Sequence, residues 1–212
     1  MVGICSRWRQ IFPEKVFNSG KQHDTVKYLN YSEHLIAYSD FGKKELEQFR
    51  NVDSYIYHGV DNEVFREINL EKGLKKNLFP EFDNPFVFLS IGDNMVRKRY
   101  DLLLKSWKKF KTEKINACLL LLTHPVSPVN GWNIPLLLKR LGIEDSVFYN
   151  KSYLKGVGLE IEELVSFYNL ADAFIMIPSA EGFGLPYLEA MACETPVIYS
   201  AYGTPAEYIA DC

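Results

Sequence analysis

The chain has 212 residues, of which 47% are hydrophobic and 14% aromatic, so it holds ample apolar material for a packed core and disorder is excluded as its main state. The net charge of −3, from 27 acidic and 24 basic residues, argues against general nucleic-acid binding, which usually requires a basic excess. No apolar run approaches the roughly 20 residues that span a bilayer, and the first residues form no secretory signal. We therefore expect a cytoplasmic protein without a transmembrane segment, with a peripheral position at a membrane as the alternative.

The sequence contains none of the usual metal or P-loop motifs. Its four cysteines are scattered without a Cys-x-x-Cys pair, and Cys118 and Cys193 lie in apolar surroundings, so we expect buried thiols in a reducing compartment. No pair of histidines has metal spacing, and no Asp-x-Asp is present to hold a divalent cation beside a diphosphate. We expect no metal and no cofactor. The absence of Gly-x-x-x-x-Gly-Lys-Ser/Thr argues against P-loop nucleotide hydrolysis.

The first 84 residues give a mixed pattern. Residues 1–30 show no clear period, but 34–39 and 54–57 are typical of strands, and 40–49 of a helix with Asp40 as its N-cap. The second strand ends at His58-Gly59-Val60-Asp61. A turn with a capping aspartate, a ligand-lining role and a hinge are all open for that stretch. Residues 62–84 are charged and irregular, with a short helix expected at 71–77, and we interpret them as a linker.

Beyond Pro85 strands and helices alternate. The expected strands and helices occupy, in chain order, residues 86–91, 100–110, 118–122, 134–141, 146–149, 159–170, 173–177, a helix after Gly184, 196–199 and a last helix from about 204. Such alternation predicts an α/β fold with a doubly wound, Rossmann-like parallel sheet. Ligands of these sheets bind beyond the carboxyl ends of the strands. We therefore expect the chemistry in the loops 92–99, 124–132, 149–158, 178–184 and 199–204.

Two of these loops are suited to an anion. Glu181, Gly182, Phe183 and Gly184 follow a strand and precede a helix, whose first-turn N–H groups can hold phosphate oxygens. Residues 97–99 place three cations at the start of another helix, where they oppose the helix dipole. A bound diphosphate would offset that cost. A solvated basic cluster is the alternative.

Glu189 is the unusual residue of the helix after Gly184. On 100° steps it points into a broad apolar arc that includes Leu185 and Met191, with Tyr187 on the opposite side. A carboxylate among apolar neighbours needs hydrogen-bond donors. The hydroxyls of a sugar are one possible source, and an arginine or lysine of the chain is the other. Were both helical, Glu181 and Glu189 would lie about 12 Å apart, which is too far for a paired-carboxylate hydrolase.

These motifs resemble a retaining glycosyltransferase of the family-4 type, which has the two-domain GT-B fold. Residues 181–192 (EGFGLPYLEAMA) with 195–198 (TPVI) are similar to the E-x7-E signature of that family. The other matching stretches, in chain order, are 37–42 (AYSDFG), 58–61 (HGVD), 91–92 with 97–98 (IG and RK) and 203–207 (GTPAE). The resemblance implies transfer of a sugar from a nucleotide-diphosphate sugar to an acceptor glycan, lipid or protein, with retained configuration and without a metal.

The resemblance also implies roles for single residues. Glu181 and Lys98 would be catalytic, Glu181 at the donor sugar and Lys98 at the diphosphate leaving group. Glu189 would bind the ribose. The other donor-binding residues would be Arg97, Gly92, Gly182, Phe183, Gly184, Leu185 and Thr204.

Two features depart from the family pattern. Asp93 stands after Gly92 where the family usually has an arginine, a charge that Arg97 or Arg99 could replace. The chain is also about half the length of family members. The resemblance therefore divides it into a remnant of an acceptor-side domain (1–61), a linker (62–84) and a donor-binding domain (85–212) that stops early. A separate acceptor domain or a homo-oligomer would complete it. The alternatives are a non-catalytic nucleotide-sugar-binding or interaction module and a related nucleotide-sugar epimerase.

Overall fold

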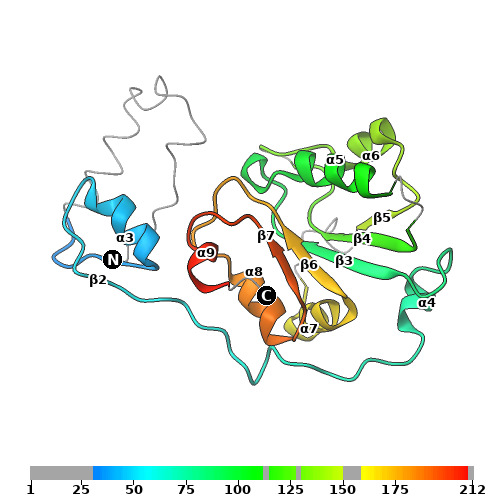
Figure 1. The fold of residues 1–212 in the computed structure, drawn as a ribbon, viewed down its shortest axis with the longest axis horizontal. Coiled ribbons are helices and arrows are strands. Elements are labelled where there is room, and N and C mark those ends of the chain that lie inside the picture. The colour runs from blue at the N-terminus through cyan, green and yellow to red at the C-terminus, as the bar shows by residue number, and fades with distance from the viewer. Residues whose placement is uncertain (1–30, 112–114, 128–129, 150–158, 210–212) are drawn as a thin grey trace. The chain divides into compact units, whose positions relative to one another are not determined.

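The computed structural model describes residues 31–111, 115–127, 130–149 and 159–209, and these fall into two units (Figure 1). The first, called the sheet unit, consists of residues 60–177 and 186–199. The second, called the small unit, consists of the described residues 31–59, 178–185 and 200–209. The domain limits expected from the sequence stay a prediction. Residues 1–30 and 150–158, which include part of an expected ligand loop, lie outside the described residues.

The sheet unit is built on one parallel sheet. Its strands are β3 (Phe86–Ile91), β4 (Ala117–Leu122), β5 (Val147–Tyr149), β6 (Ala173–Met176) and β7 (Val197–Tyr199). They lie in the order β5-β4-β3-β6-β7, and every pairing is parallel. This arrangement confirms the predicted α/β class. The strand order reverses between β3 and β6, which is the switch point where such sheets bind their ligands.

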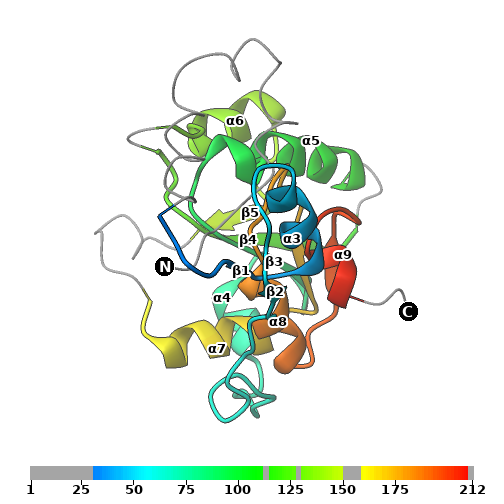
Figure 2. The same ribbon diagram turned by 90° about the vertical axis from the view of Figure 1, so that its left-hand side faces the viewer.

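Helices cover both faces of the sheet (Figures 1 and 2). The helical segments of the unit are α4 (Leu74–Leu78), the 3-10 turn η1 (Val96–Lys98), α5 (Tyr100–Lys111), α6 (Ile134–Leu141), α7 (Ile161–Leu170) and α8 (Leu185–Ala192). α5 and α6 lie on one face, and α7 and α8 on the other. Local signals fix their ends. Asn133 caps α6 by accepting from the N–H of Leu136, and Gly142 ends it with φ of 67°.

The core lies between the sheet and its helices. All six residues of β4 are buried, as a strand covered on both faces requires. Tyr100, Leu104 and Trp107 of α5 pack on one face of it together with Leu138 of α6. Cys118 and Cys193 are buried free thiols, as the sequence predicted.

The expected burial of α8 was wrong. Tyr187 is only 1% exposed, whereas Leu185 and Met191 are 40% and 39% exposed. The helical periodicity predicted Tyr187 opposite the apolar arc, yet the tyrosine ring packs edge-on against Phe174 of β6, and its hydroxyl donates to the backbone carbonyl of Met176 at the end of that strand. Burial with a satisfied hydroxyl is the usual state of a core tyrosine.

Over residues 31–59, 178–185 and 200–209, the small unit contains a two-stranded parallel sheet and two helices. They are β1 (Ile36–Ala37), α3 (Asp40–Glu47), β2 (Ser54–Tyr55) and α9 (Pro205–Tyr208). Leu35, Ala37, Leu46 and Val52 form its core. The described strands are shorter than the predicted ranges 34–39 and 54–57, because only two residue pairs form the ladder.

The predicted N-cap of α3 was wrong by one residue. Ser39, which has extended backbone, accepts from the N–H of Gly42 at 2.9 Å through its Oγ. Asp40 is the first helical residue, and its carboxylate pairs with Lys44 one turn later. An Asp beside a Ser gives two capping candidates, and sequence alone does not distinguish them.

Candidate functional site

Lys98 lies at the switch point of the sheet. Gly92 follows β3 directly, and a Cβ added there would lie 3.2 Å from Cε of Lys98, so the glycine leaves room for the lysine side chain. Nζ of Lys98 is 3.5 Å from Sδ of Met176, the last residue of β6, and the side chain is buried. A thioether is a weak acceptor. The fold therefore places an ammonium, mostly out of water, at the carboxyl ends of the two strands between which the order reverses.

The neighbouring cations differ in their partners. The guanidinium of Arg99 binds the carboxylate of Asp101, with Nε 3.1 Å from Oδ1 and Nη2 3.4 Å from Oδ2. The charge of Arg99 is thus directed to the carboxylate of Asp101. Asp93 itself is exposed.

An asparagine locks the loop after β3 to the loop after β4. Oδ1 of Asn94 accepts from the N–H of Trp132 at 2.9 Å, and its Nδ2 donates to the carbonyls of His124 and Trp132. A Cβ on Gly131 would lie 2.0 Å from the carbonyl oxygen of Asn94, so only glycine fits. Sequence reasoning missed this contact. A polar residue next to a Gly-containing loop was the available signal, but its partner lies 38 residues away.

Tyr100 adds a further constraint, because its hydroxyl donates to the carbonyl of Gly92 at 2.8 Å. The backbone around Gly92 and Lys98 is thus held from two directions. A ligand-binding loop that is fixed before the ligand arrives needs less ordering on binding.

Glu189 receives its hydrogen bond from a tyrosine. The hydroxyl of Tyr168, on α7, donates to Oε2 of Glu189 at 2.6 Å. The sequence left open an arginine or lysine of the chain as this donor. Among the described residues, the donor is Tyr168 instead. Burial raises the pKa of the Glu189 carboxyl, and the Tyr168 hydrogen bond opposes that rise. Glu189 remains half-buried rather than covered, so it is open to further donors.

The glycine loop belongs to the small unit and is anchored by Tyr208 of α9. The Tyr208 hydroxyl donates to the carbonyls of Phe183 at 2.8 Å and Gly184 at 3.1 Å. Its ring stacks on Phe183 with centroids 5.1 Å apart and an interplanar angle of 18°. Burial, with the Glu181 charge as a smaller cause, raises the pKa of Tyr208, so the hydroxyl keeps its proton at neutral pH.

The anchored carbonyls orient the N–H groups of the loop. In a trans peptide the C=O and N–H point in opposite directions. Because the carbonyls of Phe183 and Gly184 face Tyr208, the N–H groups of Gly184 and Leu185 face away from it. Gly184 adopts a φ of 93°, which favours glycine. The Tyr208 anchor therefore sets the direction of the N–H groups of Gly184 and Leu185 at the start of α8.

Thr204 and Glu207 make contacts within the small unit that the sequence did not predict. Oγ1 of the buried Thr204 lies 2.8 Å from Oγ of Ser39. The carboxylate of Glu207 accepts from the N–H groups of Asp40 and Phe41 and from the hydroxyl of Tyr57 at 2.8 Å. Glu207 thus adds a negative charge to that of Asp40 at the N-terminus of α3.

The predicted site residues fall in both units. Gly92, Lys98 and Arg97 cluster in the sheet unit, where Glu189 lies on α8. The small unit holds the predicted residues Glu181, Gly182, Phe183, Gly184, Leu185 and Thr204.

Over the described ranges, no group of three or more His, Cys, Asp or Glu side chains could hold a metal. None of the helices in the described part is long and apolar enough to cross a bilayer.

The fold matches the C-terminal Rossmann-like domains of GT-B glycosyltransferases. The chain is similar to the crystal structure of Anabaena Alr3699/HepE in complex with UDP-glucose, with a TM-score of 0.72 and 17% identity, and the match covers 94% of this chain and 53% of that one. The family model for glycosyl transferases group 1 matches residues 72–212. The chain belongs to the glycosyl transferases group 1 family.

Two curated relatives resemble the chain over most of its length. An uncharacterized glycosyltransferase of Sulfolobus islandicus rod-shaped virus 1 is 26% identical over 178 residues, which are 82% of this chain and 49% of that protein. A D-inositol 3-phosphate glycosyltransferase of Catenulispora acidiphila is 27% identical over 190 residues, which are 85% of this chain and 43% of that protein. The chain spans about half the length of the curated relatives it matches.

Proposed function

We propose that this chain binds a nucleotide-diphosphate sugar and takes part in its transfer to an acceptor hydroxyl, with retention of configuration and without a metal. The main support is Lys98, an ammonium held by Gly92 at the switch point of a parallel sheet. Membership of the group 1 family and the likeness to a fold that holds UDP-glucose in Alr3699/HepE agree with it. The base, the sugar and the acceptor are left open.

The chemistry of such a transfer assigns a task to each group. The bond between the anomeric carbon and the diphosphate oxygen breaks, and the nucleoside diphosphate leaves with the electron pair. Lys98 and Arg97 stabilise the charge that develops on it, and the N–H groups of Gly182, Phe183 and Gly184 add fixed dipoles. The acceptor oxygen bonds to the anomeric carbon, and its proton passes to the leaving phosphate.

The carboxylates hold the donor at two points. Glu181 contacts the hydroxyls of the sugar, and Glu189 accepts from those of the ribose. Leu185 and Thr204 line the remaining donor site in this proposal. A carboxylate whose burial is unfavourable gains most from new donors, so the raised pKa of Glu189 supports its assignment to a ligand.

Binding is tested by calorimetric titration of the chain with UDP-, GDP- and ADP-sugars, comparing Lys98→Met with the control Lys72→Met at an exposed position. Loss of a charged hydrogen bond costs about 1.5–3 kcal/mol, so we expect Kd to rise roughly 10- to 150-fold for Lys98→Met and to stay unchanged in the control. If the parent chain binds none of these sugars, the proposal is wrong.

Transfer is tested separately. Release of free nucleotide that depends on an added acceptor and is lost in Glu181→Gln supports an enzyme. Binding without release in the presence of acceptors supports the non-catalytic module instead. Insensitivity of the release to a chelator, together with an unchanged anomeric configuration of the product by NMR, checks metal independence and retention. The epimerase alternative predicts conversion of the donor sugar without any acceptor.

A further inference from the structure

The helices on the two faces of the sheet carry opposite charge. α5 and α6 together contain six basic side chains and one acidic one, whereas α7 and α8 contain three glutamates and no basic residue. The two pairs lie on opposite faces of the sheet unit (Figures 1 and 2). Among these four helices the basic side chains therefore all lie on one side of the sheet. Such an asymmetry orients the unit in the field of an anionic partner.

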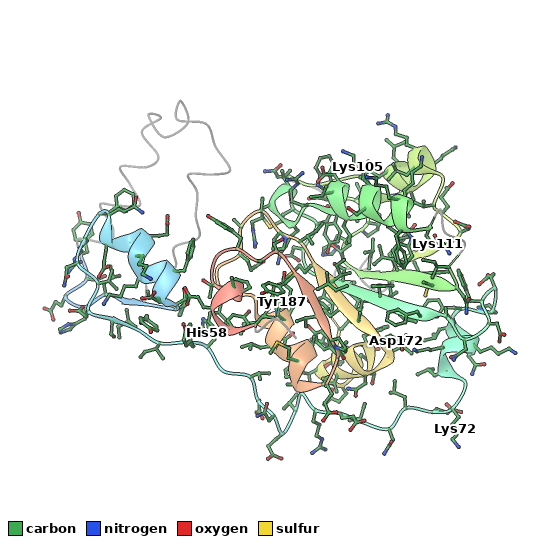
Figure 3. All side chains as sticks on the ribbon, viewed as in Figure 1. His58, Lys72, Lys105, Lys111, Asp172 and Tyr187 are labelled. Atoms are coloured by element: carbon green, nitrogen blue, oxygen red, sulfur yellow. The ribbon has the colours of Figure 1, made fainter. Side chains whose placement is uncertain are left out.

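The outward side of α5 and α6 combines cations with exposed apolar side chains. On 100° steps, Leu102, Lys105 and Lys109 share the arc of α5 that faces away from the buried Leu104 and Trp107. Figure 3 shows Lys105 on the outer side of this helix. α6 likewise exposes a leucine and two cations, Leu136, Lys139 and Arg140. The basic–apolar face is defined by Leu102, Lys105, Lys109, Leu136, Lys139 and Arg140, with Lys108 and Phe110 at its flank.

The acidic residue of α5 pairs with one cation of this face, Lys105, and more closely with Arg99, which lies outside it. Asp101 is buried, and its carboxylate is engaged by the guanidinium of Arg99, with Lys105 at 3.9 Å. Lys111, in contrast, does not belong to the face. Its ammonium donates to the carbonyls of Ile115 and Ala117 beside β4.

The apolar residues distinguish between possible partners. Cations alone would suit any polyanion. Leu102 and Leu136 are 41% and 43% exposed, and each stands among basic side chains. Burial of leucine side chains at the boundary between headgroups and acyl chains is favourable, and the neighbouring cations interact with anionic headgroups. A soluble polyanion offers no apolar layer, so the combination favours a lipid surface.

We propose that α5 and α6 dock the basic–apolar face on an anionic membrane surface. The contact is peripheral and lies on the plane of the headgroups. It does not depend on which nucleotide sugar the chain binds, because none of the residues of this face belongs to the candidate site.

The test is co-sedimentation of the full chain with vesicles of phosphatidylcholine alone and with added phosphatidylglycerol. The parent should bind only the anionic vesicles. Lys105→Glu/Lys109→Glu should weaken this binding by about fivefold or more for each lysine changed. The matched control is Lys72→Glu/Lys76→Glu, with the same change in net charge at two exposed positions, one before α4 and one within it. Figure 3 shows Lys72 far from Lys105 of α5. The control should bind as the parent does.

A second pair of variants tests the apolar part. Leu102→Ser/Leu136→Ser should reduce binding to the anionic vesicles, most clearly at high salt, and leave any binding to single-stranded DNA unchanged. Circular dichroism and thermal unfolding verify that each variant is folded. Failure of the parent to bind anionic vesicles, or an equal loss in the Lys72/Lys76 control, overturns the proposal. Unchanged vesicle binding of the leucine variants together with comparable binding to DNA also overturns it, in favour of a soluble polyanion.

Discussion

Replacing Gly92 by alanine tests the contact on which the candidate site depends. Gly92 has a φ of 151°, which L side chains rarely adopt, so we expect a loss of about 1–3 kcal/mol in the free energy of unfolding. The added Cβ would also lie 3.2 Å from Cε and 3.4 Å from Nζ of Lys98. The lysine would therefore have to move by a few tenths of an ångström. Displacing a charged group by about 1 Å from its working position can lower the rate of a reaction by up to about 100-fold.

Gly142→Ala is the matched control. Gly142 also has a positive φ, of 67°, but a Cβ there meets nothing within 4 Å. Both variants should unfold earlier in urea, whereas only Gly92→Ala should bind the nucleotide sugar more weakly, by on the order of tenfold in calorimetry. Equal binding by the two variants would show that Gly92 does not position Lys98 for a ligand. Full stability of Gly92→Ala would refute the backbone argument itself.

Three further predictions concern hydroxyls and carboxylates. Tyr208→Phe keeps the stack on Phe183 but loses two hydrogen bonds, so unfolding in urea should show a loss of about 1–3 kcal/mol, and an unchanged midpoint would contradict the anchoring role. Glu189 has a folded pKa above its unfolded value near 4.5, so its effect is most favourable below that pH and becomes unfavourable as pH rises through the folded pKa. Glu189→Gln should therefore flatten the fall in thermal stability above pH 4.5, and parallel pH profiles would refute this. Tyr168→Phe removes the donor to that carboxylate and should cost about 1–3 kcal/mol at neutral pH but less in acid, which the same melting series measures.

The sequence predicted the sheet unit well because its signals are local. β3 and α6 have the predicted limits, and the other strands of this sheet differ from prediction by one residue at one end. Continuous apolar runs and caps act over a few residues, and the alternation of elements leaves few topologies to choose from. The motif around Gly92 and Lys98 also lies within one loop, so its members were found together.

Contacts between residues far apart in the chain could not be predicted from these local signals. The donor to Glu189 is Tyr168, 21 residues earlier, and the anchor of the glycine loop is Tyr208, 24 residues after Gly184. A helical wheel does not reveal which face of α8 meets the sheet, so Tyr187 was placed on the wrong side. In each case the sequence did not show that a tyrosine hydroxyl bonds to a residue distant in the chain.

The small unit is discontinuous along the chain. After β6 the polypeptide enters it for residues 178–185, returns to the sheet unit for residues 186–199, and enters it again at residue 200. No single cut of the backbone therefore separates the two units. Shortening the chain at residue 60 would remove α3 but leave α9 behind, with Glu207 deprived of the amide groups of Asp40 and Phe41 that it binds. A chimera that exchanges the first segment must exchange the other two with it.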